Sequence, residues 1–346
     1  MSIHFSTILI TGGAGFIGSN LAWRLLGAKN KVVVFDNFSR AGTQKNAAWL
    51  TTHENRDALT ILRADLRDAV AVQDAIEGVD IVFHLAGQVA VTTSVRDPRN
   101  DFMDNALGTL NVLEGVRLAS TQPILIYSST NKVYGKMDDI LVGEDENRYF
   151  YEELKQGVPE SFPLDFHSPY GCSKGAADQY VRDYSRIYGI KGVVFRQSCI
   201  YGYRQLGVED QGWVAWFAIA ATLNRPITIY GNGKQVRDIL FIDDLLDAYE
   251  AAVEQIDVTR GKIYNIGGGP KNTISVWREF KPLLEASLDK EIPVSYDDWR
   301  PGDQHVFVSD IRQAELDFGW APKVGVKDGI ARLCEWVVAN QDLFES

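Results

Sequence analysis

A tyrosine and a lysine spaced to share one helical face are the first candidates for chemistry in this sequence. Tyr170 and Lys174 are four residues apart, so a helix places the phenol beside the ammonium. A nearby positive charge favours the phenolate, which lowers a tyrosine pKa from about 10 and makes the side chain a general base. Ser168 and Pro169 favour a helix start just before the pair, through hydroxyl capping and a proline in the first turn.

Thr130 is the third candidate, because it ends a predicted strand. Ligands of open α/β sheets bind beyond the carboxyl ends of the strands, where its hydroxyl can point into a shared crevice. A tyrosine and a lysine at this spacing also occur by chance in many helices, as an amphipathic pair on a solvated face. The catalytic interpretation therefore depends on the elements that surround these three residues.

The chain opens with the order strand, glycine loop, helix and strand. Apolar runs at 7–10 and 31–36 flank a helical pattern at 19–26. Three glycines allow the loop to turn tightly and to approach a pyrophosphate, while the helix N-terminus offers N–H groups to the phosphates. These glycines are Gly12, Gly15 and Gly18. The order predicts a dinucleotide site, and a purely structural turn is the alternative.

Asp36 stands at the end of the second apolar run and predicts which dinucleotide binds. Its carboxylate can accept hydrogen bonds from both ribose hydroxyls of an adenosine, and its charge repels a 2′-phosphate. NAD is therefore the expected cofactor, although Arg40 could soften the preference over NADP.

Further apolar runs predict a parallel sheet covered on both faces, since helical patterns separate them. These runs are 59–62, 80–87, 123–129 and 192–198. Asp65 and Gly87 fall at carboxyl ends of predicted strands, and Asp65 could serve either the ligand or the loop. We expect Asp68 to cap a helix and His84 to be a core histidine.

The last third of the chain is more mixed and predicts a second, smaller domain. Helical patterns lie at 213–223, 243–254, 274–286 and 326–340, with short strands at 227–229 and 262–266. We expect a Rossmann-type NAD-binding domain over 1–201, with 234–260 returning to it. The segments 202–233 and 261–346 then form mainly a mixed α/β substrate domain. The acidic, aromatic stretch 136–167 is long enough to predict a binding loop or lid.

Composition limits the partners and the compartment. The formal charge is −11, from 35 basic and 46 acidic residues, which argues against nucleic acid or an anionic membrane as the main partner. No segment approaches the ~20 apolar residues of a membrane span. The cysteines Cys172, Cys199 and Cys334 have neither paired nor metal-like spacing, so we expect reduced thiols, no metal and a cytoplasmic protein.

Three arginines in the second half are candidates for binding a phosphate-bearing ligand. Two arginines that flank a cleft can hold a diphosphate through paired hydrogen bonds. An arginine on a turn is more often simply solvated. The candidates are Arg204, Arg237 and Arg300.

Over nearly its whole length the sequence resembles the extended short-chain dehydrogenase/reductase family. The resemblance rests on the glycine loop, the Tyr170/Lys174 pair and several further motifs. These motifs are Asp36, Asp65-Leu66, His84-Leu85-Ala86-Gly87, Asn105, Ser128-Ser129-Thr130, Val133-Tyr134-Gly135, and the segments around Arg237 and Arg300.

Within that family, the position after the active-site threonine separates the branches. Nucleotide-sugar 4,6-dehydratases typically carry Asp-Glu there, whereas this chain has Asn131-Lys132. The runs 128–135, 166–174 and 210–213 are instead similar to the CDP-tyvelose (CDP-paratose) 2-epimerases of the nucleotide-sugar epimerase branch. That similarity implies a CDP-3,6-dideoxyhexose substrate that reacts at C2, a tightly bound and recycled NAD, and a role in lipopolysaccharide O-antigen biosynthesis.

The resemblance also implies a set of site residues. Thr130, Tyr170 and Lys174 would be catalytic. The cofactor would be bound by Gly12, Gly15, Phe16, Ile17, Gly18, Asp36, Asn37, Ser39, Arg40, Asp65, Leu66, Leu85, Ala86, Gly87, Gln88, Asn105, Ser128, Tyr170 and Lys174. The substrate would be bound by Gln88, Ser129, Thr130, Asn131, Ser198, Arg204, Arg237 and Arg300.

Several alternatives remain open from the sequence. A UDP-hexose 4-epimerase or a dehydratase with rearranged acids would use the same fold, and a non-catalytic dinucleotide sensor is more remote. Ser129 could assist Thr130 or cap backbone groups. Gly175, Ala176 and Ala177 suit close helix packing, either within the subunit or in the homo-oligomer that the resemblance implies.

Overall fold

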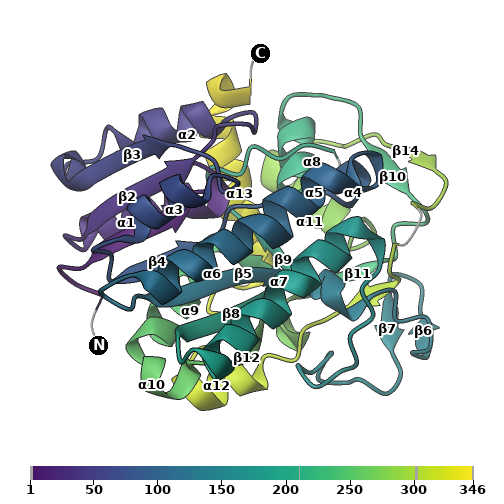
Figure 1. Ribbon diagram of the computed structural model, residues 1–346. Helices are drawn as coiled ribbons and strands as arrows, with labels where there is room; N and C mark the ends of the chain where they lie inside the picture. The colour runs from purple at the N-terminus through teal and green to yellow at the C-terminus, as the bar shows by residue number, and fades with distance from the viewer. Residues whose placement is uncertain (1–2, 210, 301–302, 345–346) are drawn as a thin grey trace.

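A seven-stranded parallel sheet is the largest element of the computed structural model, which describes residues 3–209, 211–300 and 303–344 (Figure 1). The strand order is β3-β2-β1-β4-β5-β8-β12. The strands are β1 (Thr7–Thr11), β2 (Lys31–Asp36), β3 (Leu59–Arg63), β4 (Ile81–His84), β5 (Ile124–Thr130), β8 (Lys191–Gln197) and β12 (Ile263–Ile266). The predicted Rossmann-type α/β fold is therefore confirmed. Asp210, Pro301 and Gly302, which belong to the sequence motifs, lie outside the described residues.

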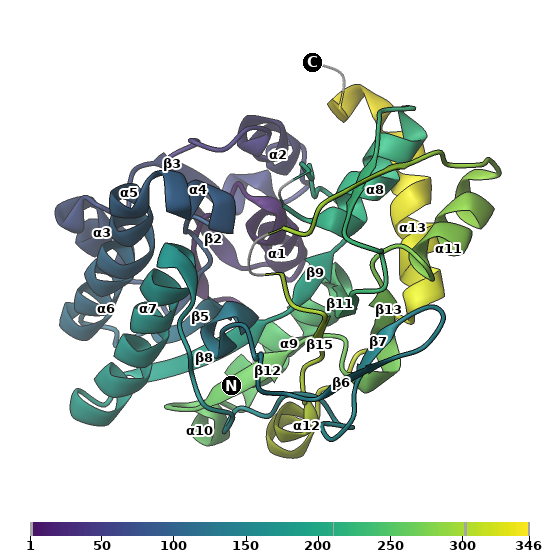
Figure 2. The ribbon, with the colours of Figure 1, turned by 90° about the vertical axis from the view of Figure 1, so that its right-hand side faces the viewer.

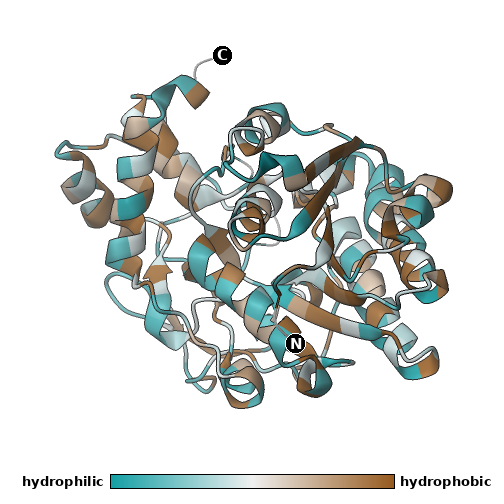
Figure 3. Ribbon diagram, turned by 90° about the vertical axis from the view of Figure 1, so that its left-hand side faces the viewer, coloured by the Kyte–Doolittle hydropathy of each residue, from teal (hydrophilic) through white to brown (hydrophobic). Residues whose placement is uncertain are grey.

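Helices cover both faces of this sheet (Figure 2). Successive strand residues point to opposite faces, so Ile8 and Ile10 pack on one side of β1 and Leu9 on the other. This explains the continuous apolar character of the strands (Figure 3). One face carries α3 (Ala69–Ile76), α6 (Gly108–Leu118) and α7 (Ser168–Ile187), and the other carries α1 (Phe16–Gly27), α2 (Thr43–Leu50) and α9 (Ile242–Glu254).

The strand order reverses beside β1, which pairs with β2 on one side and with β4 on the other. Such a reversal opens a crevice at the carboxyl ends of the strands, and ligands bind there in this class of sheet. Between β4 and α6 the chain forms α4 (Val91–Arg96), α5 (Pro98–Phe102) and the π-helix η2 (Met103–Leu107). These elements border the same edge of the sheet as the ends of β1, β4 and β5.

A smaller mixed sheet is built from later segments. It contains β9 (Cys199–Tyr201), β11 (Val236–Phe241), β13 (Thr273–Ser275) and β15 (Val306–Phe307). A parallel pair, β10 (Thr228–Tyr230) and β14 (Ser295–Asp297), lies beside it. The accompanying helices are α8 (Trp213–Thr222), α11 (Phe280–Leu288) and α13 (Val326–Ala339).

The two domains are more interwoven than the sequence suggests. Of the segment 234–260, α9 packs against the large sheet, but β11 pairs with strands of the small sheet. The segment 261–346 supplies β12, the edge strand of the large sheet, and α12 (Arg312–Phe318) packs against that strand. The reason is tertiary pairing, since the register of β12 with β8 fixes this strand in the large sheet.

The helix expected over 274–286 is wrong at its start. Ile274 pairs antiparallel with Arg237, and the helix begins only at Phe280. Ser275 and Glu279 explain the boundary. The Ser275 hydroxyl accepts the Glu279 N–H at 2.8 Å, and the Glu279 carboxylate accepts the Ser275 N–H at 2.7 Å. This reciprocal cap ends the strand and starts the helical region.

The stretch 136–167 packs against the small domain. It forms a hairpin of β6 (Val142–Glu144) and β7 (Tyr149–Tyr151). Tyr151 is buried with Val306 and Phe307, and its hydroxyl donates to the Val306 carbonyl at 2.8 Å. Its role as a binding loop or lid stays a prediction.

Two smaller sequence expectations are confirmed. Asp68 caps α3, because its carboxylate accepts the N–H groups of Val70 and Ala71. His84 is fully buried between the hydroxyls of Thr11 and Thr109, at 2.7 and 2.9 Å. Within the described residues, no helix is both long and apolar enough to cross a membrane.

The remaining short elements connect these layers. They are η1 (Arg56–Ala58), η3 (Asn131–Tyr134), α10 (Ile256–Thr259), η4 (Pro270–Asn272) and η5 (Gln341–Phe344).

Candidate active site

The structure brings Thr130, Tyr170 and Lys174 together where β5 ends against the first turns of α7. All three side chains are buried. The Lys174 ammonium donates to the Ser128 carbonyl at 2.5 Å and lies 4.4 Å from the centre of the Tyr127 ring. Thr130 forms a side-chain hydrogen bond with the Tyr170 phenol. A hydroxyl, a phenol and an ammonium therefore face one edge of the sheet.

The start of α7 sets the position of this tyrosine. The Ser168 hydroxyl accepts the Gly171 N–H at 3.2 Å, and Pro169 occupies the first turn. Gly175 lies against the Phe166 ring, and a Cβ there would come within 2.4 Å of it. The small residue thus serves packing inside the subunit. Homo-oligomerisation remains a prediction.

The electrostatics of Tyr170 differ from the sequence expectation. Burial raises the pKa of Tyr170 to about 12, and only the hydrogen bond from Thr130 opposes it. Burial also lowers the pKa of Lys174 to about 7, against the attraction of Asp178 and Asp101. The sequence predicted that Lys174 lowers the pKa of the Tyr170 phenol. With the charges of the protein alone this prediction is wrong, because desolvation of the phenol is the larger effect.

The buried ammonium predicts a pH-dependent stability difference between wild type and Lys174→Met. The lysine pKa is about 7 in the folded chain and 10.5 unfolded, so the unfolded state binds more protons between these values. Wild-type stability should rise with pH across this window relative to the variant, by up to about 1.4 kcal/mol per pH unit. Urea unfolding of both proteins at pH 7, 8 and 9 measures it. A constant difference would contradict the low pKa.

The glycine loop forms a backbone surface that has no room for side chains. Gly12 has φ +68°, and a Cβ there would lie 2.8 Å from backbone atoms of Ala86. At Gly18 a Cβ would lie 2.3 Å from the Gly12 carbonyl oxygen, so α1 packs directly on the loop. Asp36 braces the same loop, since its carboxylate accepts the N–H groups of Ala14 and Phe38 at 3.1 and 2.8 Å. This backbone arrangement fits a dinucleotide pyrophosphate.

Replacing Gly18 with alanine should weaken NAD binding at least about tenfold, because the added methyl must push the loop away from α1. The NAD content of the purified protein and its NAD dissociation constant measure the effect. Gly27→Ala, at the other end of α1, is the matched control, since its nearest neighbour would be 3.9 Å away. Equal NAD binding by both variants would contradict the proposed role of the loop.

Asn105 supplies a second observation that fits a bound cofactor. Its amide donates to Asp101 and Ser173, both at 3.1 Å, while its side-chain oxygen is buried with no hydrogen-bond partner in the described structure. That oxygen points at Gly87, where a Cβ would approach it to 2.5 Å. The loop after β4 therefore lies between Asn105 and the glycine loop. At this edge of the sheet, the Asn105 side-chain oxygen can accept a hydrogen bond from a ligand or from a water bound to that ligand.

Other residues predicted to bind the cofactor already have partners in the chain. Asp65 forms an ion pair with Arg67 at 2.7 Å and accepts from Asn37 at 3.1 Å, and the Arg67 hydrogen bond lowers the pKa of Asp65 to about 2. Arg40 donates to Gln211, while the Ser39 N–H donates to Asn37. These contacts favour the loop-building interpretation of Asp65. Phe16 and Ile17 open α1, Leu66 is buried, and Leu85 and Ala86 donate N–H groups to Thr11.

The predicted substrate residues fall into separate groups. Arg237 is buried and donates to Asp303 at 2.6 Å, while the Arg300 guanidinium lies 4.0 Å from the centre of the Tyr230 ring. Arg204 stacks instead on Trp49 of α2 at 4.2 Å, on the side of the glycine loop. The structure therefore does not place Arg204 with Arg237.

Four more candidates are bound to their neighbours. Ser129 donates to Asp178 at 2.8 Å rather than to Thr130 or a backbone group. Ser198 donates to Asp238 at 2.5 Å. Gln88 bonds to the backbone of Ala90, and Asn131 is buried with its side-chain oxygen 3.4 Å from the Thr130 hydroxyl.

Asp178 and Arg196 are the residues that sequence reasoning missed. They form a fully buried ion pair, with Arg196 donating to both carboxylate oxygens at 2.9 and 3.0 Å. Asp178 lies one turn after Lys174 on α7, and that spacing is the one signal available in the sequence. The pair connects α7 to β5 and β8 beneath the catalytic residues.

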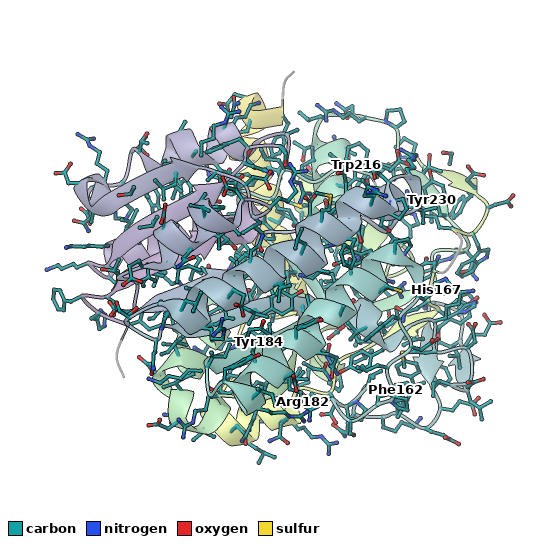
Figure 4. All side chains as sticks on the ribbon, viewed as in Figure 1. Phe162, His167, Arg182, Tyr184, Trp216 and Tyr230 are labelled. Carbon is teal, nitrogen blue, oxygen red and sulfur yellow. The ribbon has the colours of Figure 1, made fainter. Side chains whose placement is uncertain are left out.

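A cavity of about 240 Å³ opens at the N-terminal end of α7. It lies between α4, η3 and the first turn of α7, where Figure 4 labels His167. Its lining residues are Val91, Val95, Lys132, Gly135, Lys136, His167 and Ser168. The chain thus offers a space with an apolar wall and basic groups, and its lining includes Lys132 and Ser168, which lie two positions from Thr130 and from Tyr170.

Comparisons with known proteins agree with this geometry. The CDP-paratose 2-epimerase of Salmonella typhi is 46% identical over 336 residues, which cover 95% of this chain and 98% of that protein. The UDP-glucose 4-epimerase of Thermotoga maritima, solved with UDP-glucose, has a TM-score of 0.83 at 29% identity and covers 97% of this chain and 99% of its own. The dTDP-glucose 4,6-dehydratase of Streptomyces venezuelae, solved with NAD, has a TM-score of 0.83 at 28% identity, covering 98% and 99%.

The family model for the NAD dependent epimerase/dehydratase family matches residues 8–267, which include the glycine loop, Thr130 and the Tyr170/Lys174 pair. The resemblance to extended short-chain dehydrogenases/reductases is confirmed, and an enzyme is favoured over a dinucleotide sensor. The chain belongs to the NAD-dependent epimerase/dehydratase family.

Proposed function

We propose that this protein is a nucleotide-sugar epimerase that inverts C2 of CDP-paratose and forms CDP-tyvelose. The burial of Thr130, Tyr170 and Lys174 together beside the glycine loop carries the reaction type. The full-length similarity to a CDP-paratose 2-epimerase supports the substrate. Asn131 and Lys132 after Thr130 argue against a dehydratase, which needs a further acid and base to eliminate water.

The chemistry explains why such a site needs a redox cofactor. C2 of the substrate is a secondary alcohol carbon without an activating carbonyl, so simple proton abstraction cannot break its C–H bond. NAD, when bound, supplies a hydride acceptor and donor and a positive charge in its oxidised form. The residues that would hold it are the glycine loop, Asp36 and Lys174.

The protein's own residues then handle the proton and the geometry. Tyr170 takes the proton of the C2 hydroxyl. Burial raises the pKa of this phenol to about 12, and the positive charge of oxidised NAD, when bound near Lys174, would offset that increase. Thr130 holds the same oxygen through its hydroxyl. The keto-sugar must turn its other face toward the cofactor before reduction, so the nucleotide is held firmly and the sugar loosely. Arg237 and Arg300 are the proposed diphosphate residues.

Inversion at C4 of a UDP-hexose is the second candidate, because a UDP-glucose 4-epimerase shares the fold over nearly the full chain. It would use the same three residues with another sugar carbon at Tyr170. Product analysis separates the two. The purified protein is incubated with CDP-paratose and, separately, with UDP-glucose, and the sugar protons are followed by NMR.

Under the proposal, H-2 of CDP-paratose changes from an axial to an equatorial coupling pattern while UDP-glucose is unchanged. Conversion of UDP-glucose alone would replace the proposal with the C4 reaction.

A further inference from the structure

Lys132 is a basic residue beside the catalytic threonine that the proposed mechanism does not use. It lies in η3, two residues after Thr130, and its ammonium donates to the Gln304 side-chain oxygen at 3.4 Å. In the described parts of the chain, no carboxylate forms an ion pair with Lys132. An ammonium has three donors, so the bond to a neutral amide leaves Lys132 able to donate to an anion.

The loop before β15 brings this ammonium to the same place as the Arg237 guanidinium. Arg237 donates to Asp303 at 2.6 Å, and Lys132 donates to the next residue, Gln304. Gln304 is buried and fixed by its own hydrogen bond to the Gly135 carbonyl at 2.6 Å. The Arg237 guanidinium and the Lys132 ammonium therefore bind to consecutive residues, Asp303 and Gln304. Of these two residues, only Asp303 has a carboxylate.

The electrostatics agree with an excess of positive charge. Burial and then the repulsion of Arg237 lower the pKa of Lys132, while Asp303 and the Cys199 thiol oppose the shift. On its other side Lys132 lines the cavity of about 240 Å³ together with Lys136 and His167, and that lining contains no carboxylate. An anion bound between Lys132 and Arg237 would relieve the repulsion.

The position of Lys132 relates this anion to the reacting carbon. In a nucleoside diphosphate hexose, C2 is bonded to the carbon that carries the phosphate, whereas C4 lies across the ring. An enzyme that reacts at C2 must therefore bring the sugar-side phosphate close to its catalytic tyrosine. The Lys132 N–H donates to the Thr130 hydroxyl, and its ammonium is close enough to Arg237 to be repelled by it, so a phosphate bound by Lys132 would lie near Thr130.

We propose that Lys132 binds the sugar-side phosphate of the nucleotide sugar and thereby presents C2, rather than C4, to Tyr170. This inference rests on the proposed function and deepens it. Lys132 is then a specificity-determining residue, distinct from the arginines that the sequence singles out for the diphosphate. It stands where the related dehydratases carry a carboxylate, so its charge also excludes their chemistry from this position.

Binding of CDP and CMP separates a phosphate contact from a structural role, because only CDP carries the sugar-side phosphate. Titration calorimetry on the NAD-loaded protein compares wild type, Lys132→Met and Lys132→Arg, with UDP and UMP run in parallel. We expect Lys132→Met to weaken CDP binding by about tenfold or more and CMP binding by less than about twofold. Lys132→Arg should restore most of the CDP affinity. Lys327→Met, which removes an exposed charge from α13, is the control.

The same variants test the choice of carbon. With CDP-paratose, NMR should show that Lys132→Met lowers the ratio of C2 to C4 product. An unchanged CDP affinity, or equal losses for CDP and CMP, would overturn the phosphate contact, and an unchanged product ratio would overturn the regiochemical role. If wild type binds CDP but leaves CDP-paratose unchanged, the proposed function fails, while the CDP and CMP comparison still decides the phosphate contact.

Discussion

Tyr170→Phe is expected to lower kcat for epimerisation by about 10²- to 10⁴-fold, the range that general acid–base catalysis supplies. In the proposed mechanism the phenol accepts and returns the proton of the sugar hydroxyl. Its ring is buried against the first turn of α7, so phenylalanine fills the same space. NAD content and thermal stability should therefore stay close to wild type. Steady-state kinetics with CDP-paratose and the NAD content of the pure protein measure both.

Tyr180→Phe is the matched control for this substitution. Tyr180 lies on the same helix and is half exposed, and it should keep wild-type activity. If Tyr170→Phe keeps activity within about tenfold of wild type while the control is unchanged, the assignment of Tyr170 as the general base is wrong.

Arg196→Met should destabilise the folded protein by about 3–5 kcal/mol, the usual cost of removing one partner from a buried ion pair. Both side chains are nearly inaccessible, at 2% for Arg196 and 0% for Asp178. The substitution leaves the Asp178 carboxylate buried with the hydroxyl of Ser129 as its remaining bond to β5. Arg196 also donates to the Tyr134 hydroxyl at 3.1 Å, so that phenol loses a partner as well. Urea unfolding at pH 7 gives the free energy of unfolding.

Two comparisons make this stability prediction specific. Arg117→Met breaks an exposed pair with Glu114 and should change stability far less. Adding Asp178→Leu to Arg196→Met removes the unpaired charge and should recover part of the loss. A loss for Arg196→Met no larger than that for Arg117→Met would show that the buried pair does not hold α7 to the sheet.

The buried pair also connects stability to catalysis. Asp178 follows Lys174 by one helical turn, and Ser129 precedes Thr130 on β5. The bond between Ser129 and Asp178 thus fixes the helix that carries the general base against the strand that carries the oxygen-binding hydroxyl. A loss of this contact should misplace Tyr170 relative to Thr130 as well as weaken the fold.

The features that the sequence predicted well are those with local causes. The glycine loop needs close backbone approach at Gly12 and Gly18, and only glycine permits it. Asp68 caps the helix that follows it, and the alternation of apolar runs and helices determines the parallel sheet. His84 lies inside an apolar run, which correctly indicated the core.

The features that the sequence could not predict depend on distant partners. Ile274 continues a helical pattern, yet it pairs with Arg237 in a sheet that assembles from four separate segments. The sequence predicts that Arg204 binds a phosphate, but in the structure its guanidinium stacks on the Trp49 ring. The Tyr170 pKa depends on burial, which spacing along a helix does not reveal. The proximity of Lys132 to Arg237 and Gln304 also depends on the fold, because η3 and the loop before β15 are far apart in the sequence.

The most direct test of the proposed activity is an NMR time course with CDP-paratose in deuterated water. We expect H-2 to change from an axial to an equatorial coupling pattern with no deuterium at C2, because the hydrogen leaves as hydride and returns from the same cofactor. Deuterium at C2 would contradict hydride return and would require a proton-abstraction mechanism. An unchanged spectrum from folded protein with bound NAD would contradict epimerisation of this substrate.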